Sequence, residues 1–223
     1  MKNPLISSIL AAVVLVSAAV GANAQGGKPG DAVAGEKKVA TCIGCHNIPG
    51  YQASFPEIYK VPKIAGQNGA YIVAALSAYR AGERKHPSMR AIAGGLSDQD
   101  MADVAAYYEQ LGKGEGSALP AKSAEPPADV SKLLAQANCA SCHGANFSAP
   151  IAPAYPKLAG QHADYLYVAL KSYQTAHNPI YGRNNQIMVG MARPYTHPEL
   201  KLLAVYLSSL PGELKTVAQS RFR

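Results

Sequence analysis

The sequence predicts an all-α protein built from two tandem domains. Its 223 residues leave room for two domains of ordinary size. Apolar residues recur at helical spacing, and no segment has the alternation of a convincing strand. Three segments of the first half also recur, in the same order, in the second half. Hydrophobic residues make up 48% and charged residues 16% of the chain, a globular composition that excludes wholesale disorder.

The first 24 residues predict an export signal. Lys2 precedes an apolar run over residues 5–20, and Ala-Asn-Ala at 22–24 is a small-residue cleavage pattern. A permanent membrane anchor is the alternative, but the run contains serines and is shorter than the roughly 20 apolar residues that span a bilayer. No later run is long enough either. The sequence therefore predicts an exported protein that begins near Gln25, and it leaves peripheral attachment to the membrane open.

The repeated segments divide the exported chain into two halves. Residues 61–67, 70–79 and 105–111 recur as residues 155–161, 164–173 and 204–210. Between the halves lies a stretch rich in Gly, Ser, Ala and Pro that has almost no hydrophobic periodicity. The sequence therefore predicts a signal peptide over 1–24, an N-terminal domain over 25–112, a linker over 113–128 and a C-terminal domain over 129–223.

Each half begins with a predicted helix that runs into a cysteine motif. Asp31 and Asp129 suit the N-cap positions of these helices, because a carboxylate accepts hydrogen bonds from the free N–H groups of the first turn. A proline-rich loop follows the motif. The tyrosine-bearing segments 70–79 and 164–173 then predict a second helix in each half.

The last helix of each half has the clearest boundary. Ser97 with Asp100, and Thr196 with Glu199, have the spacing of a capping box. Apolar residues then repeat at helical spacing and predict the buried face. These residues are Met101, Val104, Ala105, Tyr108 and Leu111 in the first half, and Leu200, Leu203, Ala204, Leu207 and Leu210 in the second.

The formal net charge of +7 is unevenly distributed. Residues 25–117 carry +1, whereas residues 118–223 carry +5. The basic residues are scattered singly and do not alternate with aromatic residues, which excludes a nucleic-acid partner for an exported chain. Acidic proteins or anionic lipid surfaces fit this charge better.

All four cysteines belong to two copies of the pattern Cys-x-x-Cys-His. One copy is Cys42, Cys45 and His46, and the other is Cys139, Cys142 and His143. Two thiols three residues apart on a helix can add to the two vinyl groups of one porphyrin edge, and the adjacent histidine then lies under the iron. The pattern therefore predicts two covalently bound haem c groups, with His46 and His143 as metal ligands.

Three other uses of four cysteines compete with haem attachment. An exported chain often forms two disulfides, an isolated Cys-x-x-Cys can be redox-active, and Cys with His can bind zinc. Two complete motifs with no cysteine left over, and no βαβ pattern around either, favour haem c.

The repeat also indicates the sixth ligand of each iron. Met188 lies 99 residues after Met89, and at this offset only a methionine occupies equivalent positions in both halves. Both follow predicted loop residues, so each thioether could reach the haem face opposite the histidine. Met191 is the rival in the second half, but it aligns with Ile92, an apolar position expected to fill the core.

Other methionines and histidines have simpler interpretations. Met101 lies in the apolar stripe of the last helix and is expected in the core. The four remaining histidines have no repeat partner, and such residues are usually solvated. They are His86, His162, His177 and His197.

Taken together, these residues resemble the class I cytochromes c, and specifically the dihaem cytochrome c4 family. The resemblance covers essentially the whole exported chain. It implies two tandem cytochrome c domains related by a pseudo-twofold, with haem propionates near their interface. It also implies that the carbonyl oxygens of Pro62 and Pro156 accept a hydrogen bond from His46 and His143 and orient each imidazole.

The same resemblance gives the propionates their candidate partners. Tyr79 and Tyr173 on the second helices, and Gln67 and Gln161 in the repeated Pro-Lys-x-Ala-Gly-Gln segments, are expected to donate hydrogen bonds to them.

Closed His/Met coordination predicts an electron carrier and not an enzyme. Thioether sulfur favours ferrous iron, so the reduction potentials should be comparatively high. We expect a periplasmic protein that passes single electrons from a membrane quinol-oxidising complex to a haem-copper terminal oxidase, without a small-molecule substrate. The alternative is the cytochrome subunit of a periplasmic dehydrogenase complex. A self-contained dihaem enzyme is a third hypothesis, but such an enzyme would need an iron with a vacant or easily vacated coordination position.

Overall fold

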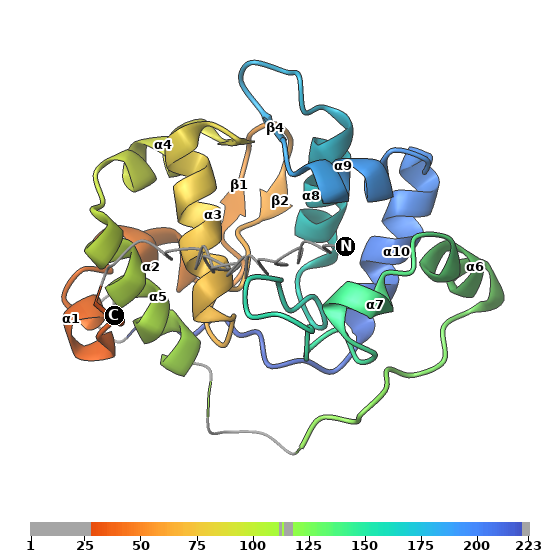
Figure 1. Ribbon diagram of the computed structural model, residues 1–223, viewed down its shortest axis with the longest axis horizontal. Coiled ribbons are helices and arrows are strands. Elements are labelled where there is room, and N and C mark those ends of the chain that lie inside the picture. The colour runs from red at the N-terminus through yellow and green to blue at the C-terminus, as the bar shows by residue number, and fades with distance from the viewer. Residues whose placement is uncertain (1–27, 112, 114–117, 220–223) are drawn as a thin grey trace, which may run out of the picture.

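The computed structural model describes residues 28–111, 113 and 118–219. The predicted signal peptide lies outside these residues. Two helical halves lie side by side, and residues 118–127, which lead into the second half, pass along one edge of the molecule (Figure 1). None of the helices in the described ranges is long and apolar enough to cross a membrane. The all-α class with two tandem domains is confirmed.

Five helices and three short strands form the N-terminal half. They are α1 (Ala32–Glu36), α2 (Ala40–His46), β1 (Gln52–Ala53), β2 (Tyr59–Lys60), α3 (Gly69–Ala81), β3 (Arg84–Lys85), α4 (Pro87–Gly94) and α5 (Asp98–Leu111). Helix α5 packs against α1 and α3. Met101, Val104, Ala105 and Tyr108 of α5 are buried in one apolar cluster with residues of α2 and α3, so the predicted apolar stripe of this helix is confirmed at these positions.

The C-terminal half repeats this order with fewer strands. Its elements are α6 (Ala128–Gln136), α7 (Ala140–His143), α8 (Ala163–Gln174), β4 (Gly182–Arg183), α9 (Gln186–Ala192) and α10 (His197–Ser209). Helix α10 packs against α8 and α6. All five apolar residues predicted on its inner face are buried: Leu200, Leu203, Ala204, Leu207 and Leu210.

The helix caps agree with the sequence in three of four cases. Asp31 caps α1 by accepting from Val33 N at 2.8 Å. Both capping boxes are present, at Ser97 with Asp100 and at Thr196 with Glu199. The N-cap prediction for Asp129 is wrong, because the N-cap of α6 is Pro127, two residues earlier. Asp129 instead lies in the first turn, where its charge still favours the helix dipole.

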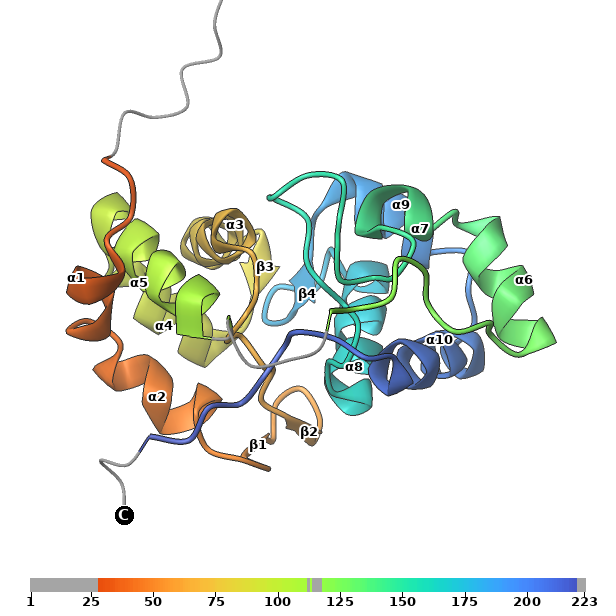
Figure 2. The ribbon, with the colours of Figure 1, turned by 90° about the horizontal axis from the view of Figure 1, so that it is seen from below.

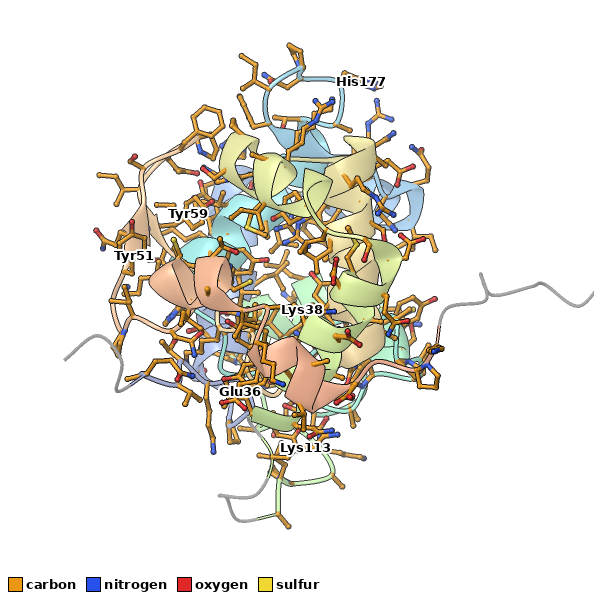
Figure 3. The ribbon with its side chains drawn as sticks, turned by 90° about the vertical axis from the view of Figure 1, so that its left-hand side faces the viewer. Glu36, Lys38, Tyr51, Tyr59, Lys113 and His177 are labelled. Atoms are coloured by element: carbon orange, nitrogen blue, oxygen red, sulfur yellow. The ribbon has the colours of Figure 1, made fainter. Side chains whose placement is uncertain are left out.

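Neither first helix runs unbroken into its cysteine motif. Helix α1 ends before α2 begins, and α6 ends before α7 begins. In the first half the chain turns at Lys38, whose Nζ lies 2.7 Å from Asp100 Oδ1 and 2.6 Å from Asp103 Oδ2 of α5 (Figure 3). In the second half Asn138 takes a left-handed conformation with φ of 45°. Each break therefore reorients the helix that carries the motif.

The lowered pKa of Asp103 predicts that the stability of the fold depends on pH. A hydrogen bond from the Asp31 backbone N–H, together with Lys38 and Gln99, lowers the pKa of Asp103 from 3.8 to about 2. The folded chain thus binds this proton more weakly than the unfolded chain, so the stabilisation is complete above about pH 4 and disappears as pH falls toward 2. In urea unfolding, Asp103→Asn should be less stable than the wild type at pH 7, with a gap that narrows below pH 4. A gap that stays constant down to pH 2 would contradict this assignment.

Four two-residue strands were not anticipated. Strand β1 pairs antiparallel with β2, and β3 pairs antiparallel with β4. Two residues are too few to give a periodic pattern, which explains why the sequence does not show them. The β3–β4 pair joins the two halves, because β3 belongs to the first half and β4 to the second. In its register Arg84 lies opposite Arg183.

The repeated Pro-Lys-x-Ala-Gly-Gln segments bind each other across the seam between the halves. Gln67 accepts from Lys157 N at 2.9 Å and donates to Lys157 O at 3.0 Å. Gln161 does the same with Lys63, at 2.9 and 2.8 Å. Both buried amides are thus engaged with the opposite half, and the predicted role of Gln67 and Gln161 as propionate partners stays a prediction. The two equivalent contacts express the pseudo-twofold.

The segment after α10 returns to the N-terminal half (Figure 2). Lys215 N donates to Ala65 O at 3.0 Å, and Asn47 Nδ2 donates to Val217 O at 2.7 Å. Val217 also packs against the apolar core of the first half. The end of the chain therefore fastens the second half to the first, beside the residue that follows His46.

Candidate functional site

Both cysteine motifs lie on short helices. Helix α2 carries Cys42, Cys45 and His46, while α7 carries Cys142 and His143 and has Cys139 at its N-cap. All four cysteine side chains are partly buried, and none of them forms a disulfide. Pairs of cysteines, each followed at once by an imidazole, are the donor set that covalent haem attachment requires.

A proline carbonyl orients each imidazole. His46 Nδ1 lies 2.9 Å from Pro62 O, and His143 Nδ1 lies 3.1 Å from Pro156 O. Because a carbonyl oxygen only accepts, Nδ1 is the donor in both rings, and the lone pair of Nε2 is left for a metal. Burial lowers the pKa of both histidines against the opposing effect of these hydrogen bonds, so the neutral form that binds iron is favoured. These residues fit a haem group.

The competing uses of the cysteines find no support in the geometry. A redox-active Cys-x-x-Cys needs a thiol with a lowered pKa, whereas burial raises the pKa of Cys42 and Cys139. Over residues 28–111, 113 and 118–219, no three His, Cys, Asp or Glu side chains gather as a metal ion would require.

The two methionines lie at equivalent positions in helices. Met89 is the third residue of α4, and Met188 is the third residue of α9. The prediction that loop residues directly precede both methionines is wrong, because α4 already begins at Pro87 and α9 at Gln186, and the residue before each helix start is its N-cap. His86 Nδ1 accepts from Met89 N at 3.4 Å, and Asn185 Oδ1 accepts from Met188 N at 3.1 Å. Each thioether is thus placed by a capped first turn.

This arrangement corrects two further expectations. His86 is a partly buried cap and not a solvated surface residue, and its equivalence to Asn185 in the repeat was the signal for that role. Met191 is 41% exposed, so it does not fill the core. Met101 has no exposed surface, which confirms its place there.

The other histidines are not equivalent to one another. His197 is exposed at the start of α10, and His177 lies exposed at the outer end of a loop (Figure 3). His162 is partly buried beside α8.

Two arginines that sequence reasoning missed lie at the seam between the halves. The Arg84 guanidinium lies 4.6 Å from the centre of the Tyr79 ring, and that of Arg183 lies 5.4 Å from the centre of the Tyr173 ring. The proposed role of these tyrosines as propionate partners stays a prediction. The arginines could have been found, because Arg183 follows Arg84 by the same 99 residues that separate the methionines.

An all-α fold in which each half holds a Cys-x-x-Cys-His helix, with its imidazole fixed by a proline carbonyl, defines a two-domain c-type cytochrome. The sequence model of the family "Cytochrome c" matches residues 32–112 and again 127–211. The chain belongs to this family, in its dihaem cytochrome c4 group. It therefore carries two covalently attached haem c groups and transfers electrons.

Known relatives of the chain agree over most of its length. A cytochrome c4 of Stutzerimonas stutzeri is 33% identical over 193 residues, which cover 81% of this chain and 90% of the relative. The crystal structure of reduced recombinant cytochrome c4 from Pseudomonas stutzeri is similar, with a TM-score of 0.61 and 30% identity, over 82% of this chain and all of that one. A thiosulfate dehydrogenase electron acceptor of Stutzerimonas stutzeri (strain A1501) is 28% identical and covers 79% of this chain and 80% of its own length.

Proposed function

We propose that the protein is a periplasmic electron shuttle that accepts single electrons from a membrane quinol-oxidising complex and delivers them to a haem-copper terminal oxidase. Haem c supplies reversible one-electron exchange when bound. In this proposal Cys42 and Cys45 hold one haem, and Cys139 and Cys142 hold the other. His46 with Met89, and His143 with Met188, bind the two irons.

One observation supports the proposal: both halves position the same pair of candidate ligands, one histidine and one methionine, by the same kinds of contact. A proline carbonyl fixes each imidazole, and a capped helix start places each thioether. A site with both axial positions filled by the protein has no place for a reactant, so it exchanges electrons without converting a substrate. Thioether ligation also raises the reduction potential toward the range of an oxidase donor.

The uneven charge supports docking to acidic partners. Residues 118–223 carry a formal charge of +5 against +1 for residues 25–117. Haem propionates make the net charge of both halves less positive, so the argument depends on the difference in charge between the halves. An acidic acceptor should associate faster with the basic half at low salt, because exposed charges are screened over about 10 Å at 0.1 M. The same charge leaves peripheral attachment to anionic lipid as part of the proposal.

Electron transfer in both directions tests this function. Membranes that contain the quinol-oxidising complex and a quinol should reduce the oxidised protein, and a haem-copper oxidase should reoxidise it, as followed by haem absorbance. Both rates should fall as ionic strength rises. Rates that are independent of salt would contradict electrostatic docking, and failure of reduction by the quinol-oxidising complex would contradict the shuttle.

A second candidate is a partner of a periplasmic dehydrogenase. The relative described as a thiosulfate dehydrogenase electron acceptor favours it. In this case the chain would take electrons from the catalytic protein instead of from a quinol-oxidising complex. Rapid reduction by such a dehydrogenase with its substrate, together with co-purification of the two proteins in fixed proportion, would favour this candidate over the first.

A further inference from the structure

The seam between the halves contains two adjacent arginines in tyrosine-rich surroundings. Arg84 and Arg183 face each other in the β3–β4 pair. Arg84 donates to Tyr71 Oη at 3.1 Å and to Tyr165 Oη at 2.8 Å, and Arg183 donates to the same Tyr165 Oη at 3.2 Å. One tyrosine of the second half thus accepts from an arginine of each half. The four residues, which we call the seam cluster, form one unit.

The seam cluster lacks a negative charge. Among the described residues, neither arginine takes part in an ion pair with Asp or Glu. Two lysines at this seam, by contrast, each pair with a carboxylate of the opposite half, Lys60 with Asp164 and Lys171 with Glu57. The Nε atom of Arg84 is buried and has no hydrogen-bond partner. Two neighbouring guanidiniums repel each other, and an unmatched buried donor is costly. Both facts indicate that the cluster is completed by anions from outside the polypeptide.

Tyr165 shows the same deficit of negative charge. Burial alone would raise the pKa of Tyr165, but Arg84 and Arg183 lower it to about 8. A phenol is a weak substitute for a carboxylate, which binds guanidinium through two parallel hydrogen bonds. The cluster therefore favours a carboxylate over any group that the chain itself supplies there.

The chain also indicates where those carboxylates come from. Arg84 lies five residues before Met89, and Arg183 lies five residues before Met188. Strand β3 leads into α4, and β4 leads into α9, so each arginine is on the segment that presents an iron ligand in the proposed function. Each haem is fixed by its thioethers and carries two propionates, so these carboxylates cannot diffuse away from the protein.

We propose that Arg84 and Arg183 bind propionates of both haems as one shared group, so that each arginine adjusts the reduction potentials of both irons. The proposal rests on the two haem sites of the proposed function. A positive charge near an iron favours the reduced state, and loss of either arginine should therefore lower both potentials. Two independent sites would predict a change at one haem only.

A potentiometric titration of the full dihaem protein, followed by absorbance, tests the shared group. For Arg84→Gln, the equilibrium constant for reduction should fall on the order of tenfold at both haems, which for one electron is about 59 mV. Arg183→Gln should have the same effect. Lys60→Gln is the matched control, because it removes a positive charge from the same seam but breaks the exposed Lys60–Asp164 pair instead. It should change either constant by less than about twofold.

The conservative variant Arg84→Lys separates charge from folding. It keeps the positive charge, so the equilibrium constant for reduction of each haem should stay within about threefold of the wild type, even if Arg84→Gln does not accumulate. A shift at one haem only, no shift at either, or an equal shift in Arg84→Lys would overturn the proposal. Wild-type potentials that respond to inorganic phosphate at constant ionic strength would show a free anion in the cluster and would also overturn it.

The titration also separates this inference from the proposed function. A wild-type protein with two covalent haems, whose potentials do not respond to the arginines, leaves the shuttle intact and removes the shared group. A protein without two covalent haems contradicts both.

Discussion

Met188→Ala should remove the methionine-to-iron absorption band of one haem and lower its reduction potential by on the order of 100 mV or more, within the roughly 0.8 V range that axial ligands control. The reason is the loss of a soft sulfur ligand that stabilises ferrous iron. The other haem should keep its band. Met89→Ala should give the same result for the first half, so the two variants together assign the two potentials to the two domains. Optical redox titration measures both quantities.

Met191→Ala is the matched control in the same helix. Met191 is three residues from Met188 in α9 but is 41% exposed. Its replacement should leave both bands and both potentials unchanged. If Met191→Ala removes the band and Met188→Ala does not, the ligand assignment in the second half is wrong.

Gly144→Ala should destabilise the second half by about 3 kcal/mol or more. Gly144 directly follows His143 and has φ of +82°, which side chains disfavour. A Cβ at this position would lie 2.0 Å from the backbone oxygen of Ala149, which cannot rotate away. The loop that returns from the motif toward Pro156 must therefore shift. Thermal unfolding and the haem content of the variant measure the effect.

Gly190→Ala provides the comparison. Gly190 lies in α9, and apart from its chain neighbours and the nearby backbone of its own helix, no heavy atom lies within 4 Å of the position that its Cβ would occupy. Alanine favours helix over glycine by about 1 kcal/mol, so this variant should be neutral or slightly stabilised. Equal melting temperatures for Gly144→Ala and the wild type would show that the loop after His143 is not constrained as described.

The features that the sequence predicted are those set by local patterns. A capping box needs two residues three apart, and a buried helix face needs one period, so α5 and α10 were placed correctly. The Cys-x-x-Cys-His motifs indicate covalent haem attachment even when the fold is not known. The repeat added a second, internal comparison, which singled out Met89 and Met188.

The features that were missed depend on contacts between the halves. Gln67 and Gln161 are engaged by lysines of the opposite repeat, and no local pattern shows how two domains meet. Strand β3 needs β4, about 100 residues away, before it is a strand at all. The capping role of His86 was missed because His86 and Asn185, which cap equivalent helices, are different residue types. Comparing roles at equivalent positions, instead of identities, would have found it.

Mass analysis of the purified protein, combined with an absorption spectrum of its oxidised form, tests whether each half holds one haem through two thioether bonds and coordinates its iron with histidine and methionine. We expect a polypeptide mass increased by two haems, with a methionine-to-iron band near the red end of the spectrum from both. A polypeptide that carries fewer than two covalent haems, or two haems without that band, would contradict this expectation.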